Sequence, residues 1–121
     1  MDAPPVEIRL RRGSRVLALV FEDGSRFELP FEYLRVHSPS AEVRGHGAGQ
    51  EVLQTGKENV QVTRVEPIGH YAVRLHFDDG HDTGLYTWKY LYELGRDQER
   101  NWQSYLDRLA AAGHSRPPQK S

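Results

Sequence analysis

The chain has 121 residues, enough for one domain with its own hydrophobic core, and it contains no cysteine. The lack of cysteine excludes disulfides, cysteine nucleophiles and metal sites built on thiolates. Its 16 basic and 17 acidic residues give a net charge of −1, so we expect no nucleic-acid partner.

The N-terminal stretch lacks the apolar segment of a signal peptide, and no apolar run reaches the length that spans a bilayer. We therefore expect a cytoplasmic protein that makes no contact with a membrane. Residues 1–5 are expected to be disordered.

The first elements predicted are three strands. Apolar residues alternate with charged ones over residues 6–11, which predicts a half-buried strand. A nearly continuous apolar run at 17–21 predicts a central strand. Asp23 and Gly24 form a strong hairpin signal, and the return strand follows at 27–29.

A short helix is predicted to follow over residues 30–36, starting at Pro30 and burying Phe31 and Leu34. Residues 37–59 contain four glycines and no sustained period, so they predict a long loop with a helical turn after Pro39. Loops of this length inside a small domain are usually functional or mobile.

The second half again predicts strands, then two helices. Val60 and Val62 alternate, and a change of phase before Val65 indicates a bulge. A turn is expected at 67–69. The cleanest alternation covers residues 71–77 and predicts a strand.

A second Asp-Gly turn at 79–80 leads to a strand that includes residues 85–86. Thr87 is expected to cap a helix that ends at Gly95, and a last helix is expected over 97–112 with one apolar face. Residues 114–121 are then expected to form a disordered tail.

The two halves form a weak internal repeat. Each predicts a strand, an Asp-Gly turn, a strand and a helix that contains Tyr-Leu. One such unit cannot bury its own apolar face, so we expect both to share one sheet. The predicted fold is a single α+β domain at 6–113, two-layered, with a mostly antiparallel sheet and helices packed on one face.

Three stretches, at residues 21–24, 29–47 and 66–95, together resemble the gamma-butyrobetaine hydroxylase-like N-terminal domain family. The resemblance extends over about residues 16–113. It implies an α+β domain that occurs alone in bacteria, beside the catalytic domain of carnitine-pathway oxygenases, and in some iron–sulfur cluster carrier proteins. For standalone members it implies a domain of unknown function.

The resemblance also implies a zinc site in the oxygenase relatives, held by three cysteines and one histidine. The matching positions here are Ser38, Ser40 and Val43 for the cysteines and His81 for the histidine. Serine is a poor zinc ligand and valine cannot ligate. We therefore predict that the domain carries no zinc and has no other cofactor.

Two polar constellations are the candidates for a site. His37, His46, His81 and Asp82 would hold a metal if the fold brought them together; otherwise they cap or pack the ends of elements. His76 and Asp78 resemble the start of an iron-binding triad, but strand alternation places them on a solvated face.

Arg35 and Arg44, with glycines at 45, 47 and 49, either bind an anion or belong to a flexible loop.

No pattern of a catalytic nucleophile is present. We therefore predict a non-enzymatic module that binds another protein and is linked to iron–sulfur or metal handling. The predicted binding surface contains Arg35, His37, Arg44, His46, His81 and Asp82. The alternative is a metal-dependent small-molecule binder or enzyme that uses His37, His46 and His81.

Overall fold

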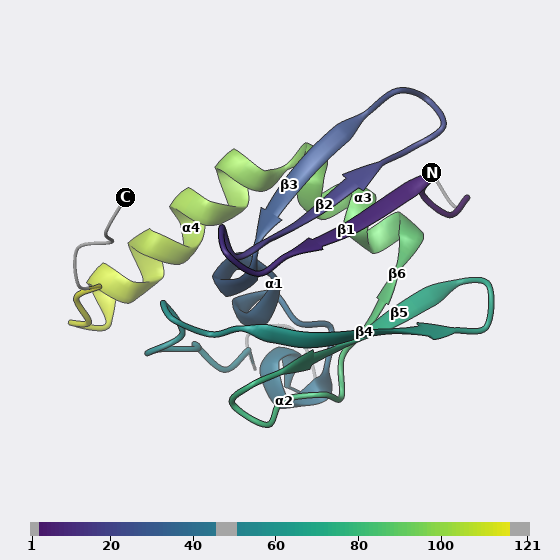
Figure 1. Ribbon diagram of the computed structural model, residues 1–121. Helices are drawn as coiled ribbons and strands as arrows, with labels where there is room; N and C mark the ends of the chain where they lie inside the picture. Colours follow the sequence, from purple (N-terminus) through teal and green to yellow (C-terminus); the bar gives the residue numbers. More distant parts are fainter. Residues whose placement is uncertain (1–2, 46–50, 117–121) are drawn as a thin grey trace.

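The computed structural model describes residues 3–45 and 51–116 of the chain. The first half forms an antiparallel meander of three strands followed by two short helices (Figure 1). These elements are β1 (Glu7–Arg11), β2 (Val16–Val20), β3 (Arg26–Pro30), α1 (Phe31–Val36) and α2 (Ala41–Arg44).

The second half repeats the meander and ends in two longer helices. Its elements are β4 (Val62–Ile68), β5 (Ala72–Phe77), β6 (Leu85–Thr87), α3 (Trp88–Arg96) and α4 (Gln98–Ala111). The predicted bulge is confirmed, since the β4–β5 register shifts between Val62 and Arg64. None of the helices among the described residues has the length and apolar run needed to cross a membrane.

The α+β fold is confirmed, but the prediction that both units share one sheet is wrong. The strands form two separate three-stranded antiparallel sheets, ordered β1-β2-β3 and β4-β5-β6. Every residue of α1 is buried, and a helix buried on all sides needs apolar partners on more than one side. The second sheet supplies them, so α1 lies between the two sheets.

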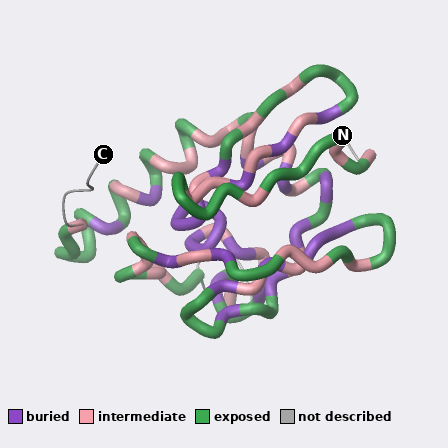
Figure 2. The backbone as a smooth tube through the Cα atoms, viewed as in Figure 1, coloured by how far each residue is buried: buried purple, intermediate pink, exposed green. Residues whose placement is uncertain are grey.

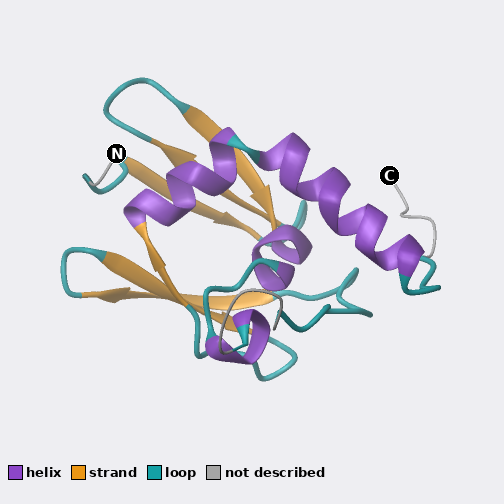
Figure 3. Cartoon of the chain, turned by 180° about the vertical axis from the view of Figure 1, so that it is seen from behind, coloured by secondary structure: helices purple, strands orange, loops and turns teal. Residues whose placement is uncertain are grey.

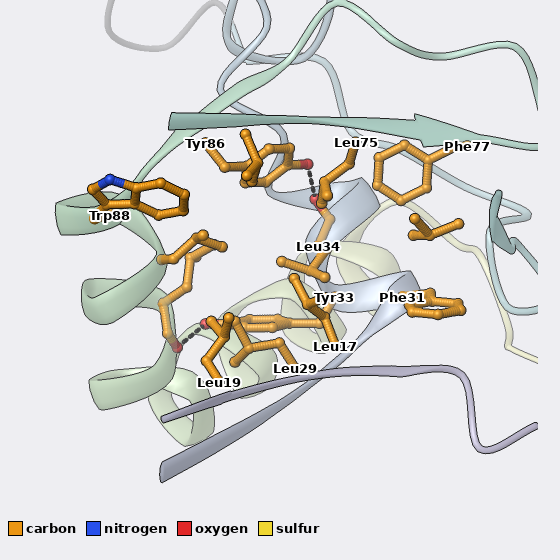
Figure 4. Close-up of a cluster of buried hydrophobic side chains, with 14 of the residues drawn as sticks. Leu17, Leu19, Leu29, Phe31, Tyr33, Leu34, Leu75, Phe77, Tyr86 and Trp88 are labelled. Carbon is orange, nitrogen blue, oxygen red and sulfur yellow. Dashed lines mark hydrogen bonds between the residues drawn. The ribbon is translucent and has the colours of Figure 1, made fainter. Parts of the chain in front are cut away.

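The core shows this arrangement directly. Figure 4 places leucines of β2 and β3 on one side of Leu34, and side chains of β5 and β6 on the other side. The hydroxyl of Tyr86 donates to the Leu34 carbonyl at 2.6 Å, and that of Tyr33 donates to the Leu94 carbonyl at 2.7 Å. These two buried hydrogen bonds tie α1 to β6 and to α3.

Helices α3 and α4 lie on the same face of the first sheet as α1, and α3 packs there against Phe27 of β3 (Figure 3). The apolar face of α4 is confirmed, because Tyr105 and Leu109 are buried against Val36. The outer strand β1 is more exposed than its alternation predicted (Figure 2). Ile8 within it and Val6 just before it are both exposed.

Two predicted boundaries were wrong, each for a packing reason. Gly95 lies inside α3, where a Cβ would overlap the Phe27 ring, so this glycine permits close packing against β3. Pro67 lies within β4, which continues to Ile68 before the chain turns at Gly69. Proline is tolerated there because β4 is an edge strand.

Candidate functional site

Buried polar side chains gather where the segment after α1 meets the loop between β5 and β6. Ser38 Oγ lies 2.8 Å from His81 Nε2, and Ser40 Oγ lies 2.7 Å from Thr83 Oγ1. Ser38, Ser40 and His81 are all buried. We call this group, together with Arg35, Asp79 and Glu42, the polar corner.

The chemistry of the partners defines the proton positions in the polar corner. His81 Nδ1 lies 3.0 Å from a carboxylate oxygen of Glu42, which as an ionised group only accepts. The Nδ1 of a neutral His81 therefore donates, and its Nε2 accepts the hydroxyl proton of Ser38. Burial, together with the positive charge of Arg35, lowers the pKa of His81 and favours this neutral form.

Asp79 links the two sides of the polar corner. Its carboxylate accepts hydrogen bonds from Arg35 Nε at 2.9 Å, from Lys57 Nζ at 2.7 Å and from the backbone N–H of His81 at 3.1 Å. Burial opposes ionisation of Asp79, but these three donors outweigh it and lower the pKa to about 2. Asp79 is therefore an anion that holds Arg35 beneath the loop.

The close approach at this corner depends on one glycine. A Cβ on Gly84 would overlap Ser38 Oγ, so any larger residue would push the two segments apart. Ser38 Oγ also accepts the backbone N–H of Ser40 at 3.3 Å. The serine hydroxyl is thus enclosed by its partners.

The described residues of the predicted binding surface do not form one exposed patch. Arg35 and His81 come together but are buried, whereas Arg44 is exposed and His37 is half-buried. Asp82 is exposed and lies 3.9 Å from His76, on the outer face of the second sheet. His46 lies outside the described residues.

Two histidines of the metal hypothesis, His37 and His81, already have hydrogen-bond partners. His37 Nδ1 lies 3.0 Å from the Tyr33 carbonyl, which only accepts, so this nitrogen donates. Both nitrogens of His81 are occupied by Ser38 and Glu42. Within residues 3–45 and 51–116, no three histidine, aspartate or glutamate side chains are grouped as metal ligands would be.

The resemblance matches Ser38, Ser40, Val43 and His81 to the zinc ligands of the oxygenase relatives, and here Ser38 Oγ contacts His81 Nε2 and accepts the backbone N–H of Ser40. The residues present do not fit zinc. Two hydroxyls and the side chain of Val43 replace the thiolates, and the histidine nitrogen that would face the metal accepts from Ser38.

A second feature is a cleft of about 420 Å³ beside the polar corner, which we call the basic cleft. His37, Arg44 and Arg108 line it together with Tyr90, and one carboxylate, Glu51, also borders it. The Arg44 guanidinium lies 4.8 Å from the centre of the Tyr90 ring. The Tyr90 hydroxyl donates to the His37 carbonyl at 2.5 Å, which fixes the ring.

Sequence reasoning missed Glu42, Asp79 and Arg108 as parts of these sites. The sequence indicates a turn at Asp79, as it does at Asp23, and nothing in it distinguishes the buried ion pair of Asp79 from the exposed position of Asp23. Glu42 and Arg108 carry no sequence signal, because Glu42 meets His81 and Arg108 reaches the cleft only in the folded chain.

The sequence of the chain matches a known protein family. The family model described as "Gamma-butyrobetaine hydroxylase-like, N-terminal" matches residues 8–92. The chain belongs to this family. None of the curated proteins matches it.

Solved structures with the same fold are similar over most of the chain. One NMR solution structure is 51% identical, with a TM-score of 0.83, and the match covers 100% of this chain and 95% of that one. A second is 50% identical, with a TM-score of 0.82, covering 98% and 89% of the two chains.

A crystal structure from Acidithiobacillus ferrooxidans ATCC 23270 is 46% identical, with a TM-score of 0.64. The match covers 75% of this chain and 91% of that one. That protein is described as one of unknown function in the DUF971 family. Membership therefore establishes the fold and assigns no activity.

Proposed function

We propose that this domain is a non-enzymatic binding module that recognises another protein through an acidic segment docked in the basic cleft. The observation that carries the proposal is the pair of arginines, Arg44 and Arg108, in one cleft. Within the described part of the chain, neither forms an ion pair with a carboxylate.

Both arginines are held by aromatic rings. Arg44 stacks on Tyr90 at 4.8 Å, and Arg108 lies 5.9 Å from the centre of the Tyr105 ring. Stacking limits the freedom of a guanidinium without using its N–H donors, which stay available for a carboxylate. Preorganisation of this kind lowers the entropy lost on binding.

A binding role fits the polar corner better than catalysis does. Ser38, His81 and Glu42 are connected in the order of a serine-hydrolase triad. However, Ser38 is only 1% exposed, and its hydroxyl is enclosed by the Ser40 amide and Gly84. Because this hydroxyl is buried and already bonded to His81 and the Ser40 amide, we assign the array to holding the cleft in shape.

The wider role that we propose is an accessory one in iron–sulfur or metal handling. Its support is the occurrence in cluster carrier proteins and beside oxygenases that the family resemblance implies, which is an association between domains and not a property of this site. An acidic segment of such a partner is the ligand that the basic cleft would take.

The test uses a synthetic peptide of alternating glutamate and glycine, with a glutamine version as its neutral control. We expect saturable binding by calorimetry at low salt, and a loss of about tenfold or more in affinity for the double variant Arg44→Ala and Arg108→Ala. The matched control is Arg26→Ala with Arg100→Ala, which removes the same charge elsewhere. Equal losses in both double variants would show that the attraction is not specific to the cleft.

A further inference from the structure

A second cleft, at the N-terminal end of α1, is lined by a buried carboxylate. Glu32 is 8% exposed and lies in the first turn of α1. A carboxylate removed from water is costly unless a cation pairs with it. The surroundings of Glu32 are therefore built to hold a positive charge.

The charge is supplied by Arg116, which lies beyond the end of α4. Its Nε and Nη2 each donate to a separate oxygen of Glu32, the first at 2.9 Å. The guanidinium also lies 5.1 Å from the centre of the Trp102 ring. A two-pronged carboxylate contact combined with an aromatic wall is the arrangement by which proteins recognise arginine side chains.

The cleft has room for more than this one side chain. Arg116 is part of its lining, and about 750 Å³ remains open, which is within the range of ligand pockets. We call it the acidic cleft, because Glu58 and Glu99 also line it and neither forms an ion pair within the described residues.

The other two arginines of the lining are engaged elsewhere. Arg15 donates to the Asn59 side chain at 3.1 Å, and Arg96 pairs with Asp97 at 3.0 Å. Asp97 neutralises Arg96, but the Asn59 amide is uncharged, so Arg15 keeps its positive charge. Arg15 offsets one of the two glutamates Glu58 and Glu99, and the excess of one negative charge that remains in the lining favours a cationic guest.

We propose that the acidic cleft is a recognition site for an arginine-bearing segment of a partner protein, and that Arg116 occupies it in cis until such a segment displaces it. Arg116 lies only three residues beyond Gly113, where the backbone turns at a positive φ of 78° after α4. This tether makes Arg116 an intramolecular competitor with a high effective concentration. Its removal should therefore strengthen binding of an external arginine.

The experiment compares the full chain with its Arg116→Ala variant. The probe is a blocked Gly-Arg-Gly-Arg-Gly peptide, followed by the indole N–H signal of Trp102 in NMR spectra. The Trp88 indole, which donates to the His70 carbonyl at 2.8 Å, is the internal reference. We expect about tenfold tighter binding by Arg116→Ala, and weaker binding of the lysine version, which cannot form the two-pronged contact.

Two further variants locate the site, both made in the Arg116→Ala background. Glu32→Gln should abolish peptide binding, and Glu58→Gln, which leaves the buried carboxylate in place, should weaken it. Arg100→Ala, an exposed change on α4, should have no effect. The proposal is overturned if millimolar peptide leaves the Trp102 signal of Arg116→Ala unmoved, or if binding survives Glu32→Gln. Neither result would bear on the basic cleft, which is probed with an acidic peptide.

Discussion

The two Asp-Gly turns have the same local conformation but different roles. Gly24 and Gly80 have φ angles of 87° and 88°, and in both turns the glycine N–H donates to the phenylalanine three residues earlier. Asp23 is exposed and bonds to Ser25 and Tyr92 near the surface. Asp79 instead accepts from the buried Arg35.

The difference arises from the length of chain between each turn and its return strand. After the first turn, β3 pairs at once, and Val20 lies opposite Arg26. After the second, β5 and β6 begin to pair only at Arg74 and Leu85, so residues 78–84 are free of the β5–β6 ladder. That freedom lets His81 and Thr83 reach the segment after α1. A turn motif specifies local geometry, and the length of the return loop decides whether it joins a site.

The largest expected difference between the regions of the two Asp-Gly turns concerns metal binding. We expect the variant Ser38→Cys, Ser40→Cys and Val43→Cys to retain about one zinc per chain after dialysis, while the parent chain retains none. The reason is that Ser38 contacts His81, Ser40 contacts the nearby Thr83, and Val43 lies in the helix that Ser40 caps, while thiolates are the ligands that the parent lacks. Elemental analysis of protein purified without a metal-affinity tag measures it.

The control is a triple-cysteine variant at the junction of α3 and α4, on the exposed residues Arg96, Glu99 and Arg100. It should retain no zinc, because no hydrogen bond or ion pair of the described residues joins these three positions to a histidine. Zinc retained by the parent chain would contradict the prediction. So would the absence of zinc from a folded variant with cysteine at Ser38, Ser40 and Val43.

The next prediction compares how much the two repeated halves of the chain contribute to the stability of the core. Phe21 and Phe77 immediately precede the two turns and are both buried. Replacing either with alanine should lower the free energy of unfolding by roughly 3–5 kcal/mol, since each change removes buried area and leaves a cavity. Denaturant titration of both variants measures the effect. A loss confined to one of them would show that the core is centred on a single unit.

Much of the fold could be predicted from the sequence, because alternation, Asp-Gly pairs and the Thr87 cap are local signals. The element order and the bulge near Val65 followed from them. The pairing into two sheets could not be predicted, since strand periodicity specifies an apolar face and not the element that covers it. The burial of all of α1 was the missing information.

The candidate site was less predictable for the same reason. The histidine and arginine residues were visible, but the burial of Arg35 and His81 depends on contacts between segments some 44 residues apart. The aspartate that joins them, Asp79, had an adequate local explanation as a turn residue. A local explanation can therefore conceal a tertiary role.

The smallest expected contrast separates the two turn aspartates. Asp79→Asn should lower the free energy of unfolding at pH 7 by about 2 kcal/mol, because the carboxylate pKa of about 2 lies below its usual value of 3.8. Asp23→Asn should move the denaturant midpoint less, since the Asp23 carboxylate is exposed to water and screened.

The lowered pKa of Asp79 also predicts how its contribution to the free energy of unfolding changes with pH. A lowered pKa means that the unfolded chain binds a proton at Asp79 more readily than the folded chain does. The contribution of Asp79 is therefore complete above about pH 4 and is lost as the pH falls toward 2. Denaturant midpoints of the parent and Asp79→Asn should differ at pH 7 and converge near pH 2. A constant difference across that range would mean that the amide acts by disturbing the loop, and that the ion pairs with Arg35 and Lys57 contribute little.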